Sequence, residues 1–413
     1  MPKRLFALGV RLIILLYIII STPLTLPISL ILYAVRKDFL VRIGCFTRFH
    51  QEALGHWVVD SSILIARAGR RPKVNNGFDI YYYEPSIEIC NQYWRTLISR
   101  HLRFAPWYMV IGIHYWIRNI ASLNQLNILM PVDENGSRDI NGELSSVPCR
   151  LCFNTQETQN AEHFFRYYGL APNTPYICLL VRDSAYKGSS GVQGTFSIRN
   201  SNIEDFRDLA IYCIERGIAV IRMGKKTSNR LNLASRLFID YSLSPLKSDF
   251  LDVWLFANCL LCVSTAAGAD SISDVFRRPI LYINHTIPEL LTSWSYAIHS
   301  FKIFRWARSN AMLSLTEMLN LSWWSNGIST QVYDQNNIVF ESIPPKVMAS
   351  ICEEAILKIN GKWEITSEEK LAQERFFAIL NEHPNFQKYN LYRHENASIS
   401  YGWLKYVSEQ FLY

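Results

Sequence analysis

Short runs of apolar residues alternate with longer amphipathic stretches through the central part of the chain. Segments 176–181 and 218–221 are almost entirely apolar, and helical periodicity runs through 203–216 between them. Strands that are apolar on both faces are typical of parallel sheets covered by helices. The pattern therefore predicts an α/β fold, in which ligands bind at the carboxyl ends of the strands.

The alternation continues towards residue 284. It predicts a helix at 252–258, a strand at 259–263, a second helix at 270–276 and a second strand at 280–283. In the loop between strand and helix, Ser264, Thr265 and Gly268 are small or hydroxylated, so the backbone can approach a ligand closely. The start of the following helix favours an anion, although such a loop also occurs for packing alone. Asp270 can cap that helix or contact hydroxyls of a donor.

Basic residues fall where two of the predicted strands end. Arg182 follows the first strand, and Arg222 follows the second together with Gly224 and Lys225. Guanidinium groups can bind the oxygens of a diphosphate bidentately. These residues and the loop predict a phosphate site, in which Arg182, Arg222 and Lys225 offset the charge on a leaving nucleoside diphosphate. The alternative is that each arginine is a solvated strand terminus or a salt-bridge partner.

Several of these segments carry a family resemblance. The stretches are RDSAY at 182–186, RNS at 199–201, IRMG at 221–224, SDFLD at 248–252, and STAAGADS with FRRPILYIN within 264–284. They resemble a little-characterised bacterial glycosyltransferase family associated with surface-polysaccharide synthesis. The wider pattern, in which Ser264 and Thr265 open a helix after an apolar strand, is similar to fucosyltransferase-like enzymes of the GT-B fold.

The resemblance implies two Rossmann-like domains and a nucleotide diphosphate-sugar donor that is bound without a metal or other cofactor. It matches Arg182 to an arginine of the donor domain and assigns Arg199 to the phosphate contacts. Fucosyltransferase-like enzymes typically have a histidine two residues before that arginine, whereas this chain has Leu180. The resemblance therefore does not indicate which sugar is transferred.

The amino terminus is apolar and uncharged from Leu12 to Val35, long enough to cross a bilayer core of roughly 30 Å. The apolar region is too long for a cleaved signal, and basic residues flank both of its ends, so the positive-inside rule gives no orientation. Because Pro23 and Pro27 interrupt helix hydrogen bonds, a re-entrant helix-break-helix anchor is favoured over a straight span. We expect the protein to be located at the inner (cytoplasmic) membrane, with its catalytic domains on the cytoplasmic face.

The net charge of +7, from 42 basic and 35 acidic residues, is modest. Much of the excess flanks the apolar segment, where anionic membrane lipid is the natural partner, and nucleic acid is not implied. The nine cysteines form no disulfide framework, which suggests a reducing cytoplasm. Cys149-x-x-Cys152 and Cys259-x-x-Cys262 have the spacing of a four-cysteine zinc site. Cys259 and Cys262, however, lie in the predicted strand, where residues three apart point to opposite faces and cannot bind the same ion. We therefore predict no metal site.

The region after the anchor begins with a predicted strand at 39–43, a loop at 44–49 and a helix at 50–68, as in a Rossmann-like domain. In GT-B enzymes the loop after the first strand commonly supplies the base that takes the proton from the acceptor hydroxyl. His50 and Glu52 lie there. The alternative is that His50 caps the helix and Glu52 sits in its solvated first turn.

The length allows an anchor and two domains of ordinary size. We predict a membrane anchor at 1–36, an N-terminal acceptor domain at 37–168, a linker at 169–175, a C-terminal donor domain at 176–340, and C-terminal helices with a tail at 341–413. The predicted function is transfer of a sugar from a nucleotide diphosphate-sugar to a growing surface polysaccharide or a lipid-linked glycan. The alternatives are a non-catalytic membrane-anchored subunit of a polysaccharide assembly complex and a GT-B-like nucleotide-sugar epimerase or phosphorylase.

Overall fold

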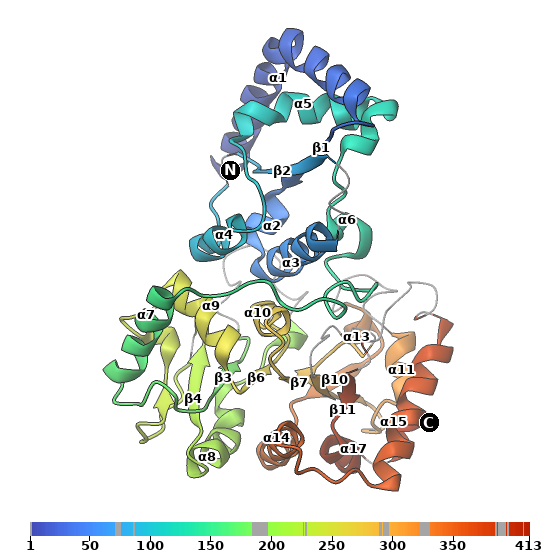
Figure 1. Ribbon diagram of the computed structural model, residues 1–413. Helices are drawn as coiled ribbons and strands as arrows, with labels where there is room; N and C mark the ends of the chain where they lie inside the picture. The colour runs from blue at the N-terminus through green and yellow to red at the C-terminus, as the bar shows by residue number, and fades with distance from the viewer. Residues whose placement is uncertain are drawn as a thin grey trace. The chain divides into compact units, whose positions relative to one another are not determined.

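The chain folds into two units, Met1–Arg138 and Asp139–Tyr413 (Figure 1). The computed structural model describes residues 2–70, 76–85, 87–183, 197–225, 227, 229–288, 291, 297–321, 331–384, 386, 394, 396–407 and 409–413. Each unit combines parallel strands with helices, so the protein belongs to the mixed α/β class that the apolar pattern predicted.

The first unit is built around two parallel strands, β1 (Leu40–Phe46) and β2 (Gly77–Tyr83), paired from end to end. Its helices are α1 (Pro2–Val35), α2 (Arg48–Glu52), α3 (Leu54–Arg70), α4 (Gln92–Ser99), α5 (Trp107–Asn119), the 3-10 helix η1 (Ala121–Leu126) and α6 (Pro131–Asn135). The predicted strand–loop–helix start is present in altered form. β1 ends at Phe46 instead of Ile43, and the helix predicted at 50–68 is divided into α2 and α3 at Ala53.

Helix α1 is continuous through Pro23 and Pro27, so the re-entrant break predicted from these prolines does not occur within residues 2–35. The hydroxyls of Thr25 and Ser29 donate to carbonyls one turn back. Helix α5 packs closely along α1, because a Cβ added at Gly112 would lie 2.8 Å from Cγ2 of Thr25. Packing against a second helix can hold a helix together where proline removes a backbone hydrogen bond.

Many apolar side chains of α1 are exposed. Ile13, Ile20 and Leu24 are 63%, 77% and 67% exposed, which is unusual for the helix of a water-facing domain. The segment Gly9–Val35 is long enough and apolar enough to cross a membrane.

The second unit contains a seven-stranded sheet within the described residues, ordered β11-β8-β7-β6-β3-β4-β5, and every neighbouring pair is parallel. The strands are β3 (Tyr176–Leu180), β4 (Ala219–Met223), β5 (Phe238–Ile239), β6 (Leu261–Ser264), β7 (Ile280–His285), β8 (Ala297–Phe301) and β11 (Ala397–Ile399). A small antiparallel sheet pairs β9 (Ile303–Trp306) with β10 (Ile338–Glu341).

Helices cover both faces of this sheet (Figure 1). The described helices of the second unit are α7 (Thr155–Tyr167), η3 (Ser197–Arg199), η4 (Ile203–Phe206), α8 (Arg207–Glu215), η5 (Tyr241–Leu243), α9 (Asp249–Asn258), α10 (Ser271–Val275), α11 (Leu315–Asn320), α13 (Gln331–Gln335), α14 (Pro345–Ile359), α15 (Ser367–Glu382), α17 (Tyr401–Val407) and η6 (Glu409–Leu412). Ile177 and Leu179 of β3 join the apolar cluster that contains α8 and α14. Between them, the Cys178 thiol lies 3.4 Å from the carbonyl of Leu255 in α9. Because successive side chains of a strand point to opposite faces of the sheet, β3 packs against the helices on both faces.

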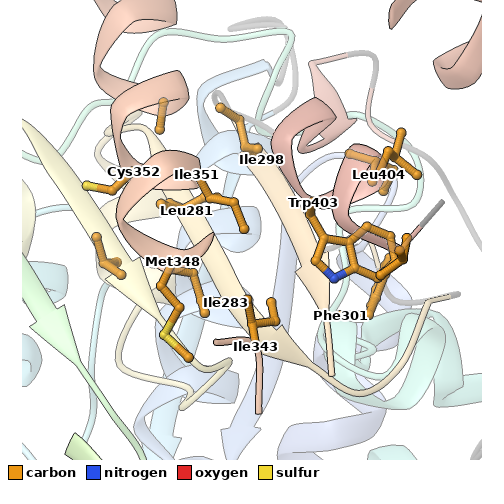
Figure 2. Packing of buried hydrophobic residues seen from close by; sticks show 14 of the residues in the cluster. Leu281, Ile283, Ile298, Phe301, Ile343, Met348, Ile351, Cys352, Trp403 and Leu404 are labelled. Atoms are coloured by element: carbon orange, nitrogen blue, oxygen red, sulfur yellow. The ribbon is translucent and has the colours of Figure 1, made fainter. Parts of the chain in front are cut away.

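The carboxyl-terminal segment completes the second unit. Figure 2 shows Trp403 and Leu404 of α17 and Ile351 of α14 beside Leu281 of β7 and Ile298 of β8. The region after Asn284 therefore supplies β8 and β11 to the sheet. The tryptophans of this region predict an irregular segment, but Trp294, Trp323 and Trp324 lie outside the described residues.

The boundary between the units falls at Arg138/Asp139, upstream of the linker predicted at 169–175. Helix α7 lies within the residues 37–168 predicted as the N-terminal domain. Its Phe165 ring lies 5.3 Å from the ring of Tyr176 and 5.9 Å from that of Trp254, measured between centroids. Both partners belong to the second unit, and these aromatic contacts attach α7 to it.

Candidate functional site

The carboxyl ends of β3 and β6 are tied together at Arg182. Its backbone N–H donates to Oγ1 of Thr265 at 2.9 Å, and the N–H of Thr265 donates to the carbonyl of Leu180 at 3.1 Å. The carbonyl of Arg182 accepts from the N–H of Ser201 at 2.9 Å, which brings the segment that carries Arg199 to the same edge. Arg182 and Thr265, both predicted site residues, thus lie together. Residues 184–186 of the resembling stretch RDSAY lie outside the described residues.

Arg199 extends from η3 towards the β6–α10 loop, where its guanidinium donates to the carbonyl of Ala266. The pKa of Arg199 is lowered to about 10, mainly by burial and in smaller part by the charge of Arg182, while Asp270 opposes both effects. Arg199 therefore stays protonated at neutral pH. Two guanidiniums close enough to act on each other concentrate positive charge at this edge of the sheet, and a dianion such as a diphosphate would be attracted there.

Hydrogen bonds of Ser264 and Asp270 stabilise the β6–α10 loop. The Ser264 hydroxyl donates to Oδ2 of Asp270 at 2.6 Å, and the N–H of Ala267 donates to the same oxygen at 3.1 Å. Both side chains are buried, and burial raises the pKa of Asp270. Gly268 has φ +74°, a left-handed conformation that glycine adopts without strain. The Ser264 hydroxyl, which the sequence predicted as a phosphate contact, therefore donates to Asp270 in this structure.

Arg222 has a different setting from the one predicted. Strand β4 continues to Met223, so Arg222 lies within it instead of after its end. The side chain is 3% exposed, and its Nη1 donates to Oδ2 of Asp240 at 2.9 Å. Gly224 follows the strand with φ +155° and accepts from the Lys247 ammonium, while Lys225 is exposed. The salt-bridge alternative describes Arg222 better than a phosphate contact does.

Two basic side chains that the sequence argument missed lie at the same edge as Arg199. His285 ends β7, and its pKa is lowered to about 3 by burial and by the charge of Arg199. Lys302 directly follows β8, and its ammonium donates to the carbonyl of Asn200 at 2.6 Å. Burial lowers the pKa of Lys302 to about 8. The rule that ligands bind at strand ends points to His285 after the predicted strand at 280–283, and it would have found Lys302 had β8 been recognisable.

In the first unit, His50 is fully buried. Its Nε2 lies 2.8 Å from Oδ2 of Asp60, and its Nδ1 lies 3.2 Å from Oγ1 of Thr47. With both ring nitrogens engaged, this geometry favours a structural role. Glu52 is 52% exposed at the end of α2, and both of its carboxylate oxygens lie 3.0 Å from Nε of Arg48. Of the two predicted bases, Glu52 is therefore the one accessible to an acceptor hydroxyl.

The first unit also contains a cavity of about 410 Å³. It lies where β1 and β2 end, and Thr47 and Glu84, the residues that follow those strands, line it. The complete lining is Arg11, Ile14, Ile18, Cys45, Thr47, Tyr82, Glu84, Ile111, His114, Tyr115, Arg118 and Asn119. Glu84 was not among the predicted residues, although it directly follows the apolar run at 81–83.

No protein-family model and no curated protein matches the chain. Its structure resembles ADP-heptose LPS heptosyltransferase II from E. coli (12% identity, 59% of this chain and 84% of that one, TM-score 0.34). It also resembles a family 9 glycosyl transferase from Veillonella parvula (11% identity, 59% of this chain and 80% of that one, TM-score 0.34). A third similar structure is the E. coli heptosyltransferase WaaC with ADP (11% identity, 59% of this chain and 87% of that one, TM-score 0.31). These neighbours are glycosyltransferases, but similarity this weak assigns no activity, which must be argued from the residues.

Proposed function

We propose that this protein is a glycosyltransferase that moves a sugar from a nucleotide diphosphate-sugar to a surface-polysaccharide or lipid-linked acceptor. The observation that carries the proposal is that Arg182 and Arg199 come together at the carboxyl ends of β3 and β6, where the backbone of Arg182 bonds to Thr265 and Ser201 and the guanidinium of Arg199 bonds to Ala266. Ligands of open parallel sheets bind at this edge, and paired guanidiniums suit a diphosphate. The resemblance around 182–284 supports the same reaction.

During transfer, the bond between the anomeric carbon and the diphosphate oxygen breaks, and negative charge grows on the leaving nucleoside diphosphate. Arg182 and Arg199 supply fixed positive charge where that oxygen would lie. Charge placed in advance stabilises the transition state more than the ground state, and removing such a donor costs on the order of 100- to 1000-fold in rate. Because two guanidiniums can neutralise the leaving group, the proposed reaction does not require a divalent cation.

We propose association with the inner membrane, with both units on its cytoplasmic face, where nucleotide-sugars are available. The long apolar helix α1 and its exposed side chains support this placement. A membrane-bound enzyme would act on acceptors that are lipid-linked or held near the surface. On the acceptor side, Glu52 is the predicted base that remains exposed.

Binding of nucleotide-sugars to the full-length protein in neutral detergent tests the proposal. Thermal stabilisation would be measured with ADP-, GDP-, UDP-, dTDP- and CMP-sugars, for the wild-type protein and for Arg182→Ala and Arg199→Ala. Arg166→Ala is a matched control, because Arg166 lies in the second unit on α7 and forms an exposed ion pair with Glu162. Stabilisation by one nucleotide class, lost in both site variants and kept in the control, is expected.

Absence of stabilisation by any nucleotide-sugar would overturn the donor site. Binding without release of the nucleoside diphosphate, even with membrane extracts as the source of acceptor, would favour the non-catalytic subunit. Release of a free isomerised nucleotide-sugar would favour the epimerase. These outcomes separate the glycosyltransferase from the non-catalytic subunit and from the epimerase.

A further inference from the structure

The cavity of the first unit is an open one, and its lining residues come from α1 and α5 and from the ends of β1 and β2. Helix α1 contributes Arg11, Ile14 and Ile18, which lie three and four residues apart and hence on one helix face. Helix α5 contributes a second face with the same spacing, formed by Ile111, His114, Tyr115 and Arg118. The carboxyl ends of β1 and β2 contribute Cys45, Thr47, Tyr82 and Glu84 to the lining. Its volume of about 410 Å³ falls within the range of small-molecule sites, roughly 300–1,000 Å³.

The charged residues of the cavity are two arginines and one carboxylate. Arg118 is near the strand ends, because its positive charge acts on the titration of Cys45 and Tyr82. Arg11 reaches the cavity from α1, and Glu84 is held through one carboxylate oxygen by the N–H of Arg48 at 2.7 Å. Two positive charges against one negative charge make the cavity a site for an anion.

The polar wall between these charges is neutral and fixed. Nδ1 of His114 lies 2.9 Å from the hydroxyl of Tyr82, and its Nε2 lies 2.8 Å from Oδ1 of Asn127. Burial lowers the pKa of His114 to about 4, so the ring is neutral at pH 7. A neutral ring that donates from Nε2 to the amide oxygen accepts the Tyr82 proton at Nδ1. His114 therefore adds no third positive charge, and the arginines are the groups that attract an anion.

The other walls are apolar and belong to the helices that carry the exposed apolar surface. Ile14 and Ile18 line the cavity, while the neighbouring Ile13, Leu15 and Ile19 of α1 are 63%, 47% and 58% exposed. A ligand with a hydrocarbon chain could therefore leave the cavity along α1 without exposing that chain to water. A soluble anion would gain nothing from these isoleucines, whereas an amphiphile would bury part of its chain against them.

We propose that this cavity binds the phosphate headgroup of a membrane-resident amphiphile, with Arg11 and Arg118 on the phosphate and Ile14, Ile18 and Ile111 beside the first part of the hydrocarbon chain. The inference rests on the proposed function, for which it identifies the acceptor class as a lipid-linked phosphate or diphosphate. Thr47 and Glu84 then offer hydrogen bonds to the headgroup side of the acceptor.

Binding of three probes to the full-length protein in neutral detergent tests this site: dodecyl phosphate, dodecanol and inorganic phosphate. Calorimetry would compare the wild-type protein with Arg11→Gln and Arg118→Gln. Arg36→Gln is a matched control, because Arg36 follows the other end of α1 and donates to the carbonyl of Tyr33. We expect dodecyl phosphate to bind at least about tenfold more weakly to both site variants, to bind the control normally, and to bind the wild type more tightly than either of the other probes.

Equal binding of dodecyl phosphate to wild type, Arg11→Gln and Arg118→Gln would overturn the proposal, because it would indicate unspecific uptake into the detergent. Inorganic phosphate bound as tightly as dodecyl phosphate would also overturn it, since the site would then take a soluble anion. Arg118→Lys keeps the charge and should retain binding, which excludes a folding defect as the cause of the loss. Nucleotide-sugar stabilisation is read in the same samples, so failure of the donor site and failure of the cavity are distinguishable.

Discussion

Nη1 of Arg222 donates to Oδ2 of Asp240 at 2.9 Å, and this ion pair is nearly excluded from solvent. Removal of the arginine would leave Asp240 without its buried counter-charge, which costs about 3 kcal/mol. We therefore predict that Arg222→Ala lowers the free energy of unfolding by about this amount, as measured by chemical denaturation. The folded fraction should still bind the donor. Loss of donor binding with unchanged stability would restore Arg222 to the phosphate site.

Substitution of Arg182 or Arg199 should affect turnover more than stability. We expect Arg182→Ala and Arg199→Ala each to reduce kcat by roughly 100- to 1000-fold, since each removes a charge that opposes the developing anion. Release of the nucleoside diphosphate by single-turnover kinetics measures this effect, with Arg166→Ala as the control. An unchanged kcat in either variant would remove that arginine from the mechanism.

Substitution of three residues of the first unit tests which side chain takes the proton from the acceptor hydroxyl. Glu52 is the exposed one of the two bases predicted from the sequence, so Glu52→Gln should reduce kcat by on the order of 100-fold or more. Glu84, which lines the cavity and accepts a hydrogen bond from the N–H of Arg48, is the comparison, and a large loss in Glu84→Gln alone would move the base to the cavity. His50→Gln should lower stability, because it breaks the buried contact with Asp60. A large kcat loss in Glu52→Gln alone would confirm the base predicted from the sequence.

We predict that the buried His285 makes the second unit less stable at acidic pH. Its folded-state pKa of about 3 lies below the unfolded value of about 6.5, so the unfolded chain binds the proton more tightly. Its contribution to stability is therefore complete above about pH 6.5 and is lost as the pH falls towards 3. Denaturation at several pH values should show a shallower acid decline for His285→Gln than for the wild type. The exposed His163 of α7 provides the control, and His163→Gln should leave the decline unchanged.

The close contact of α1 with α5 makes Gly112 a sensitive position. A Cβ there would lie 2.8 Å from Thr25 and 2.9 Å from Ser21, so Gly112→Ala should destabilise the first unit by about 1–3 kcal/mol. Gly9 of α1 has open space around it, and Gly9→Ala should be neutral or stabilising by about 0.5–1 kcal/mol. Denaturation in neutral detergent compares the two. Equal effects would contradict the packing described for α1.

The sequence by itself determined the local elements of the sheet. The apolar runs at 176–181, 218–221, 259–263 and 280–283 correspond to β3, β4, β6 and β7, because a strand buried on both faces needs apolar residues throughout. The position of Arg182 after β3 could also be predicted, since it depends only on where the apolar run at 176–181 ends. The apolar length of α1 was equally plain, because it is a property of consecutive residues.

Tertiary structure decided which polar groups remain available to a ligand. Arg222 and Arg182 look alike in sequence, yet Asp240 neutralises one while the charge of Arg199 bears on the other. Pairing between residues distant in the chain leaves no local signal, and strand ends cannot be placed to within a residue from apolar pattern alone. The cavity that carries Glu84 and Arg118 exists only because α1 and α5 pack beside the ends of two parallel strands. Long-range packing, which periodicity does not encode, therefore decided the chemistry of both sites.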